Sequence, residues 1–535
     1  MENQDLKQRI MALSPSQRAN LAQRLSPAST PQRLVAYIVS KSATADTHSL
    51  KSLLKSRLPN YMVPAAIVTL ETLPRTANGK IDVNALPAPQ FSSAKHTEEQ
   101  PPRTEIEATL IHIWQEVLKL DTIGIHDNFF ELGGDSILSI QIVSRAREAG
   151  LRLAPNQLFE SPTVVELATV VNGAPEVVAT QALVTGQVPL TPIQQWFFEQ
   201  KMAASHHWHQ AMLVELPNVK KDTLQAAINQ LWHHHDALRM QFNGHQQINA
   251  DASQPPELIQ LDLAHLGELE QQTAVANYGD GLHCHTNLTQ GGLLQAALFN
   301  RGENQPPWLL LSAHHLIIDA VSWQILLEDL SKLLNGTSQL VEKTTSFKTW
   351  AEILVNQTAV RQSEANFWFA QAERDSIQLP RDSSEMHTPI EGTAKTVIVS
   401  LGTGETQALL KTVPAVYNTQ INDALLTALG QTLLQWVNLS TGTVRLDIEA
   451  HGREQIADGI DLSRTVGWFT TTYPVSFHID TADSCVELLK SVKEQLRQVP
   501  HRGIGYGMLR YLSDATTRQR LSQSVPSEVS FCCPK

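Results

Sequence analysis

An apolar, strand-like run that ends in two adjacent histidines constrains this chain more than any other feature. Residues 308–313 form the run, and His314 and His315 follow it directly. Asp319 comes four residues later, and a helical pattern begins behind it. The sequence therefore predicts a strand that carries two imidazoles to its end, with a carboxylate on the returning loop. Imidazole can exchange protons near neutral pH, although two histidines that only cap a strand would give the same pattern.

Length and composition set wider limits. A chain of 535 residues exceeds one compact domain, and 42% hydrophobic with 18% charged residues is typical of folded domains. The net charge of −12, without a basic block, gives no support for nucleic-acid binding. A polar start and the lack of any run of 18 apolar residues predict a cytoplasmic protein without a membrane segment. Four cysteines without a CxxC pair predict neither a disulfide framework nor zinc.

The first hundred residues predict an arm, a small α+β unit and a linker. Residues 1–32 have helical spacing and predict a helical arm, whereas residues 91–102 have the composition of a linker. Residues 33–90 contain two strand-like runs around a helical one, and a turn at Asn78-Gly79 that exposes Lys80.

Residues 58–64 and 76–82 of this unit resemble the end of an adenylation domain of nonribosomal peptide synthetases. The resemblance implies that Lys80 touches an acyl-adenylate. Only 32 residues precede the unit, however, and they cannot hold the phosphate loop and the large amino-acid-binding core. We therefore expect a lid remnant without adenylation activity of its own, and an adenylating enzyme acting in trans.

Residues 103–172 read as a small helical bundle that contains a glycine turn. Gly133 and Gly134 precede Asp135 and Ser136, and a helical pattern follows. Asp-Ser is an ordinary helix N-cap, and a serine there also lies where a phosphodiester is favoured. Residues 127–136 resemble the peptidyl carrier domain of the same synthetases. The resemblance implies a four-helix bundle, 4′-phosphopantetheine covalently attached to Ser136, and a phosphopantetheinyl transferase and other synthetase modules as partners.

Residues 173–187 predict a second linker, and residues 188–535 form a large α/β region with several histidine clusters. Consecutive histidines such as His233 to His235 point in different directions, so we expect no metal site. Four blocks of this region together resemble the condensation superfamily and, within it, the epimerization branch: residues 319–323, 449–454, 464–473 and 500–507. The implied fold is a pair of chloramphenicol-acetyltransferase-like α/β subdomains in a V, with a tunnel between them.

Three positions depart from the usual family patterns. Ala320 and Ala450 stand where glycine is usual, and these small-for-small changes leave the implied function intact. Asp135, where many carriers have histidine, is similar to carriers that stand before an epimerization domain. The family pattern would continue beyond Phe531 for several dozen residues, so we expect a C-terminally truncated epimerization domain.

The resemblance implies an epimerase that inverts an α-carbon from L to D while the substrate is held as a thioester. One group must remove a proton and another must return one to the opposite face. We expect Glu449 and His315 to form this acid/base pair, Asp319 to orient the loop and His314, and Tyr473 to stabilise an enolate-like intermediate. Neither a metal nor a redox cofactor is expected.

Two alternatives remain open from the sequence. One is a condensation domain, in which His315 would position an acceptor amine while a peptide bond forms. The other is a carrier and docking protein whose truncated epimerization domain is inactive. The Glu449 block differs from a typical condensation pattern and favours epimerization over the first alternative.

Overall fold

The computed structural model describes residues 35–39, 66–70, 72, 74, 86–87, 101–130, 132–173, 179–217, 219–382, 390–417 and 419–532. The chain divides into two compact units, one of residues 1–98 with 412–418 and the other of residues 99–411 with 419–535. The predicted arm at 1–32 and the predicted turn at Lys80 lie outside the described residues.

The first unit contains a two-stranded parallel sheet. Strand β1 (Val35–Val39) pairs in register with β2 (Ala66–Leu70). Both strands were predicted from their apolar runs and are confirmed. A short helix, α15 (Val413–Tyr417), belongs to the same unit by its contacts.

The carrier region of the second unit is helical, as predicted. Its core packs Trp114 against Phe129, with ring centroids 5.2 Å apart. Gly134 must be glycine because a Cβ there would lie 2.5 Å from the Phe129 ring. The Asp135 carboxylate then caps the next helix by accepting hydrogen bonds from the backbone N–H groups of Ile137 and Leu138. The helices are α4 (Glu105–Leu118), α5 (Ser136–Glu148), α6 (Pro155–Glu160) and α7 (Val164–Val170).

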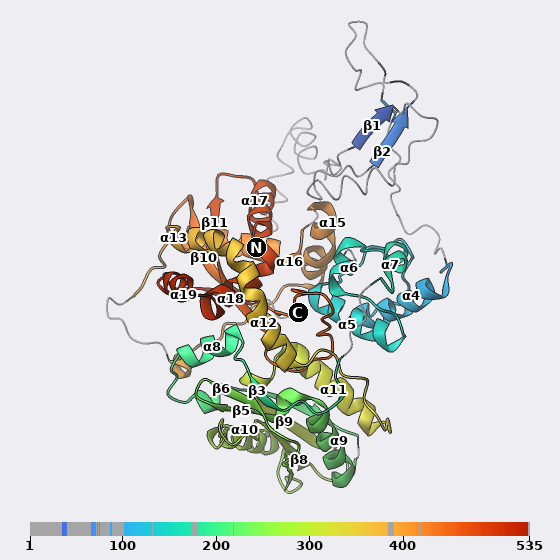
Figure 1. The fold of residues 1–535 in the computed structure, drawn as a ribbon, viewed down its shortest axis with the longest axis vertical. Helices are drawn as coiled ribbons and strands as arrows, with labels where there is room; N and C mark the ends of the chain where they lie inside the picture. The colour runs from blue at the N-terminus through green and yellow to red at the C-terminus, as the bar shows by residue number, and fades with distance from the viewer. Residues whose placement is uncertain are drawn as a thin grey trace, which may run out of the picture. The chain divides into compact units, whose positions relative to one another are not determined.

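Two groups of strands and helices follow, which we name the first and second subdomains (Figure 1). The first has the sheet order β4-β9-β8-β7, in which the fully buried β9 runs antiparallel to both of its neighbours. A smaller sheet has the order β3-β6-β5. The strands are β3 (Gly186–Val188), β4 (His209–Glu215), β5 (Met240–Asn243), β6 (Gln246–Asn249), β7 (Leu258–Asp262), β8 (Leu294–Asn300) and β9 (Trp308–His314). The helices are α8 (Pro192–Glu199), α9 (Lys221–His234), α10 (Glu268–Cys284) and α11 (Ala320–Leu334).

The second subdomain is built on a sheet of order β11-β10-β12 with its own hydrophobic core. Helix α18 contributes Met508 to the first core and Leu509 to the second, so it joins the two. The strands are β10 (Thr441–Ala450), β11 (Thr471–Asp480) and β12 (Ser530–Cys532). Helix α12 (Phe347–Arg361) packs Phe347, Trp350 and Leu354 into the first core. The helices of the second subdomain are α13 (Ala365–Glu373), α14 (Thr403–Gln407), α16 (Ile421–Trp436), α17 (Cys485–Arg497), α18 (Ile504–Leu512) and α19 (Ala515–Ser522).

A buried ion pair joins the two subdomains. The Arg453 guanidinium, beyond the end of β10, donates hydrogen bonds of 3.0 and 3.3 Å to the two carboxylate oxygens of Asp319. The two side chains are 1% and 7% exposed. Asp319 also caps α11 by accepting from the Ser322 N–H, and it accepts from the Phe469 N–H. Gly452 allows this approach, because a Cβ there would lie 1.7 Å from the Phe469 carbonyl oxygen.

The prediction that Asp319 orients His314 through a hydrogen bond is therefore wrong. The His314 ring bonds instead through Nε2 to the Ser205 carbonyl and accepts at Nδ1 from the Leu316 N–H. The aspartate instead pairs with an arginine and caps a helix.

Imidazole rings cluster on one edge of the first subdomain. The rings of His209 and His283 stack with centroids 4.4 Å apart, and both approach the Ser312 hydroxyl, at 3.2 and 2.9 Å. His314 meets His209 edge-on at 5.2 Å. Burial lowers the pKa of His209 to about 3 and that of His314 to about 4. Within the described residues, no group of three or more His, Cys, Asp or Glu side chains has the geometry of a metal site.

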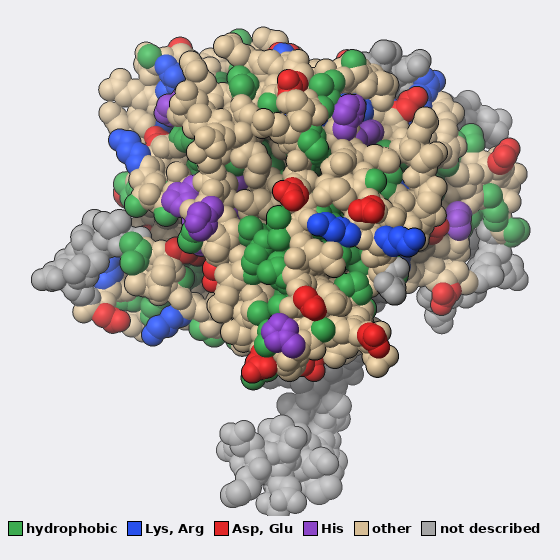
Figure 2. Space-filling view, turned by 90° about the horizontal axis from the view of Figure 1, so that it is seen from below, with side chains coloured by type: hydrophobic (Ala, Val, Ile, Leu, Met, Phe, Trp, Pro, Cys, Tyr) green, Lys and Arg blue, Asp and Glu red, His purple; other side chains and the backbone are tan. Residues whose placement is uncertain are grey.

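The surface carries charges of both signs. On the face drawn in Figure 2, acidic, basic and histidine side chains are interspersed among neutral ones. Of the helices in the described ranges, none combines the length and apolar character needed to cross a membrane.

We predict that Asp319→Ala lowers the free energy of unfolding by about 3–5 kcal/mol, because it leaves the Arg453 guanidinium buried without its partner. Urea denaturation followed by tryptophan fluorescence measures the loss. The control is Arg520→Met, which breaks an exposed pair with Glu373 and is expected to cost at most about 1 kcal/mol. A loss no larger than that of the control would contradict the assigned role of the ion pair.

The imidazole cluster predicts acid sensitivity. In the unfolded chain histidine binds a proton near pH 6.5, whereas the folded chain keeps His209 and His314 neutral to about pH 3 and 4. Stability is therefore complete above pH 6.5 and falls as the pH drops below it. We expect His209→Gln to flatten this fall by about 1.4 kcal/mol per pH unit between pH 6 and 5. The exposed His265→Gln should leave the slope unchanged, and equal slopes for all three proteins would refute the prediction.

Candidate active site

A chain of hydrogen bonds fixes the tautomer of His315. The Trp323 indole Nε1–H can only donate, and it donates to Gln210 Oε1 at 2.9 Å. The Gln210 amide nitrogen must then be the donor in its 2.9 Å contact with His315 Nε2. His315 Nδ1 lies 2.8 Å from the Ile318 carbonyl, so it carries the proton. His315 is thus a neutral imidazole whose lone pair is on Nε2.

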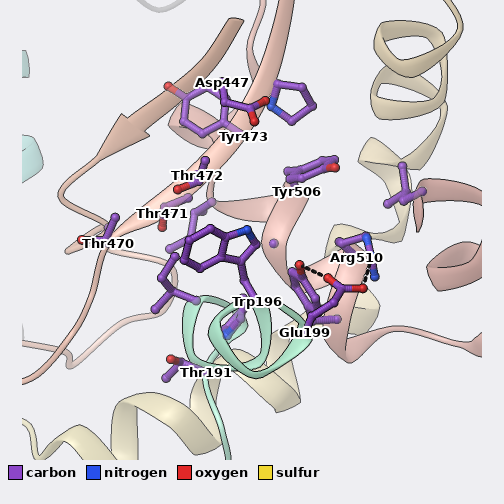
Figure 3. A pocket seen from close by; sticks show the side chains of 18 of the residues that line it. Thr191, Trp196, Glu199, Asp447, Thr470, Thr471, Thr472, Tyr473, Tyr506 and Arg510 are labelled. Atoms are coloured by element: carbon purple, nitrogen blue, oxygen red, sulfur yellow. Dashed lines mark hydrogen bonds and ion pairs between the residues drawn. The ribbon is translucent and has the colours of Figure 1, made fainter. Parts of the chain in front are cut away.

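A cavity of about 470 Å³ lies beside this histidine, and both subdomains contribute to its wall (Figure 3). Trp196 rises from α8 toward Thr471 and Thr472 at the start of β11. Glu199, also on α8, accepts hydrogen bonds from Arg510 at 2.6 Å and from the Tyr511 hydroxyl at 2.7 Å. These contacts close one side of the cavity with groups from α8 and α18.

Tyr473 lines the cavity, as expected of a residue that acts on a substrate. Burial raises the pKa of Tyr473 to about 12, and the nearby Glu454 carboxylate adds to the effect. The phenol therefore stays protonated at neutral pH and can donate a hydrogen bond.

Neither His315 nor Glu449 is among the residues that line this cavity, but each has a neighbour that is. The His315 ring packs on Trp468 with centroids 4.4 Å apart, and Trp468 is part of the wall. Glu449 is exposed and pairs in register with Thr472 across β10 and β11. Directly opposed residues share one face of an antiparallel sheet, so Glu449 lies on the same face as Thr472, another residue of the wall.

Ser136 lies in a different cavity, of about 170 Å³, between the carrier region and the second subdomain. It is the first residue of α5, where the helix dipole favours a phosphate, although the Asp135 carboxylate already accepts from the Ile137 and Leu138 N–H groups. The hydroxyl therefore fits the attachment point of a phosphodiester.

Polar contacts hold α5 of the carrier against the condensation-like region. Arg147 donates to the Asp461 carboxylate at 2.9 Å, and Lys332 of α11 lies 2.9 Å from Glu148. Arg464 binds the buried Asp329 and also lies 3.7 Å from Glu148, so a buried charge network reaches the carrier surface.

Sequence reasoning assigned no role to Gln210, Trp468 or Arg464. Gln210 follows a histidine-rich stretch, and no spacing signals that it faces His315 from the neighbouring strand. Trp468 and Arg464 lie inside a block that was recognised, but only the fold shows what each contacts.

Three family models match the chain in succession. The model of the AMP-binding enzyme C-terminal domain matches residues 27–80, that of the phosphopantetheine attachment site matches residues 108–171, and that of the condensation domain matches residues 184–533.

Curated relatives agree with this order. One of the linear gramicidin synthase proteins of Brevibacillus parabrevis is 45% identical over 94% of this chain and 6% of its own length. Gramicidin S synthase 1 of Brevibacillus brevis is 36% identical over 90% of this chain and 44% of its own length. The chain thus spans less than half the length of these relatives.

Among solved structures, the epimerization domain from the third module of tyrocidine synthetase B is similar, with 31% identity and a TM-score of 0.61. The match covers 66% of this chain and 82% of that domain. Together these findings show that the chain belongs to the nonribosomal peptide synthetases, with an adenylation-domain C-terminal segment, a carrier region that bears 4′-phosphopantetheine on a serine, and a condensation-superfamily domain.

Proposed function

We propose that the protein converts the α-carbon of an aminoacyl or peptidyl thioester from L to D. The observation that supports the proposal is that His315 packs on Trp468 and Glu449 pairs with Thr472, since both of these neighbours line one cavity. The likeness to a solved epimerization domain supports it. Ser136, inside the matched carrier region, is the proposed attachment serine.

Inversion needs a base on one side of the α-carbon and an acid on the other. His315 is suited to either role, since its neutral ring exposes a basic lone pair on Nε2 once the Gln210 amide moves aside. The Glu449 carboxylate is suited to the opposite role. When it is attached, the phosphopantetheine thiol holds the substrate as a thioester, which acidifies the α-proton.

Tyr473 supplies a further group. Because its phenol remains protonated at neutral pH, it can donate a hydrogen bond to negative charge that develops on the thioester oxygen. Asp319 acts at a distance, through Arg453 and the cap of α11.

The V-shaped arrangement of the subdomains and the four-helix carrier bundle stay predictions, as does the cytoplasmic location. The same holds for the domain limits and for the phosphopantetheinyl transferase and trans-acting adenylating enzyme as partners.

Condensation is the second candidate, because the family model that covers most of the chain is that of the condensation domain. In that reaction His315 would face the amine of an acceptor. A carrier that only docks, without catalysis, is the third candidate.

We predict that His315→Gln and Glu449→Gln each slow exchange of the α-proton of a carrier-bound amino acid with solvent deuterium by about 10²–10⁴-fold. Mass spectrometry of the loaded chain measures this exchange. The control is Glu373→Gln, an exposed position on α13, which should exchange at the unmodified rate. Unchanged exchange in both active-site variants would refute the assignment, whereas peptide growth without exchange would favour condensation.

The tautomer of His315 gives a second prediction. In the neutral state, ¹⁵N chemical shifts should show the proton on Nδ1 and a bare Nε2, because Gln210 donates to Nε2. Gln210→Leu should convert this state to a mixture of tautomers, while the signals of the exposed His245 do not change. A proton on Nε2 in the unmodified protein would overturn the hydrogen-bond chain described above.

A further inference from the structure

The cavity that contains Ser136 has several basic side chains on its wall. The carrier supplies Ser136 and Phe159, and the second subdomain supplies two loops, at residues 451–456 and 501–502. These loops bring His451, His501 and Arg502 to the cavity. The proposed catalytic residues are not part of this wall, so it needs a separate explanation.

Arg502 is the side chain best placed to bind an anion there. Its guanidinium lies 4.0 Å above the Phe159 ring of the carrier, a cation–π contact that holds it beside α6. It lies 3.8 Å from the Glu454 carboxylate, which is too far for a hydrogen bond. That contact leaves the guanidinium donors available, and the side chain is 45% exposed.

The backbone that presents Arg502 is strained. His501 and Arg502 have φ values of 45° and 53°, and Gly503 follows with φ of 84°. Non-glycine residues rarely adopt this conformation, and they keep it only where their surroundings fix it. His501 Nδ1 is held 2.8 Å from Glu364, and a Cβ on Gly503 would collide with the Tyr473 ring at 2.1 Å. The loop is thus fixed in a form that turns both basic residues toward the carrier.

Other groups in the cavity favour or oppose the binding of an anion. Arg453 also lines this cavity. Two of its guanidinium nitrogens donate hydrogen bonds to Asp319 and to two carbonyl groups. Its Nε is buried and has no hydrogen-bond partner. Glu454 is the opposing acid. Burial raises the pKa of Glu454. The N-terminus of α5 adds a further favourable field.

We propose that Arg502, with His451 and His501, binds the phosphodiester that the attached cofactor places on Ser136, so that the loaded carrier docks more tightly than the unloaded one. The proposal rests on Ser136 as the attachment site, which is part of the proposed function. It adds a recognition step that depends on the phosphate and not on the amino acid carried. A guanidinium and a phosphate form strong charge-assisted hydrogen bonds.

Hydrogen–deuterium exchange on the full chain, with and without phosphopantetheine, tests the proposal. We expect the cofactor to slow backbone exchange in residues 136–141 and 500–503 by about tenfold, since a hydrogen bond to a charged group stabilises the docked state. Arg502→Gln should abolish this difference. The matched control is Arg497→Gln, an arginine 40% exposed and 3.5 Å from Glu494, which should retain it.

The ³¹P signal of the phosphodiester gives a second readout on the same proteins. It should be shifted and broadened in the unmodified protein and in Arg497→Gln, and narrow in Arg502→Gln. Identical signals and identical protection in all three would overturn the proposal. If Ser136→Ala still gained the mass of the cofactor, the attachment site in the proposed function would be wrong. Loss of α-proton exchange alone would leave the phosphate contact standing.

Discussion

The buried pair between Asp319 and Arg453 ties the two subdomains together at the point where the candidate site forms. Asp319 caps α11 four residues after His315, and Arg453 follows the strand that carries Glu449. The ion pair therefore joins the two segments that carry the proposed proton-transfer groups. Its geometry also explains why Gly452 precedes the arginine, since no side chain fits against the Phe469 carbonyl.

The two proposed proton-transfer residues have different surroundings. On the first subdomain, Trp323, Gln210 and Ile318 leave His315 one tautomer. On the second, Glu449 lies exposed on a sheet face shared with Thr472. Trp468 packs on His315 and lines the cavity. A substrate in the cavity would have to displace the Gln210 amide to reach the histidine, which makes Gln210 a barrier to reaction in the empty site.

Much of this could be predicted from sequence because it is local. The strand before His314, the cap formed by Asp135 and the helix behind Asp319 all follow from apolar periodicity and capping residues. Helix α16 likewise begins where Gln420 and Asp423 make a capping box.

Contacts between distant segments were not predictable in the same way. The choice of Arg453 over His314 as the partner of Asp319 depends on how two subdomains dock, because the two paired residues are 134 positions apart in the chain. Gln210, which donates to His315 Nε2, lies on the neighbouring strand, and nothing in the sequence pattern marks it as a partner of this histidine. Arg502 comes to the cavity of Ser136 through a strained loop and a contact with Phe159, and neither is visible in the spacing of residues.

The central claim is that two side chains from opposite subdomains move a proton across one tethered carbon. The most direct measurement is the configuration of amino acid released from the loaded chain over time, starting separately from the L and the D enantiomer. The account predicts that both starting materials converge on one common mixture of L and D. Retention of the starting configuration in both cases would contradict it.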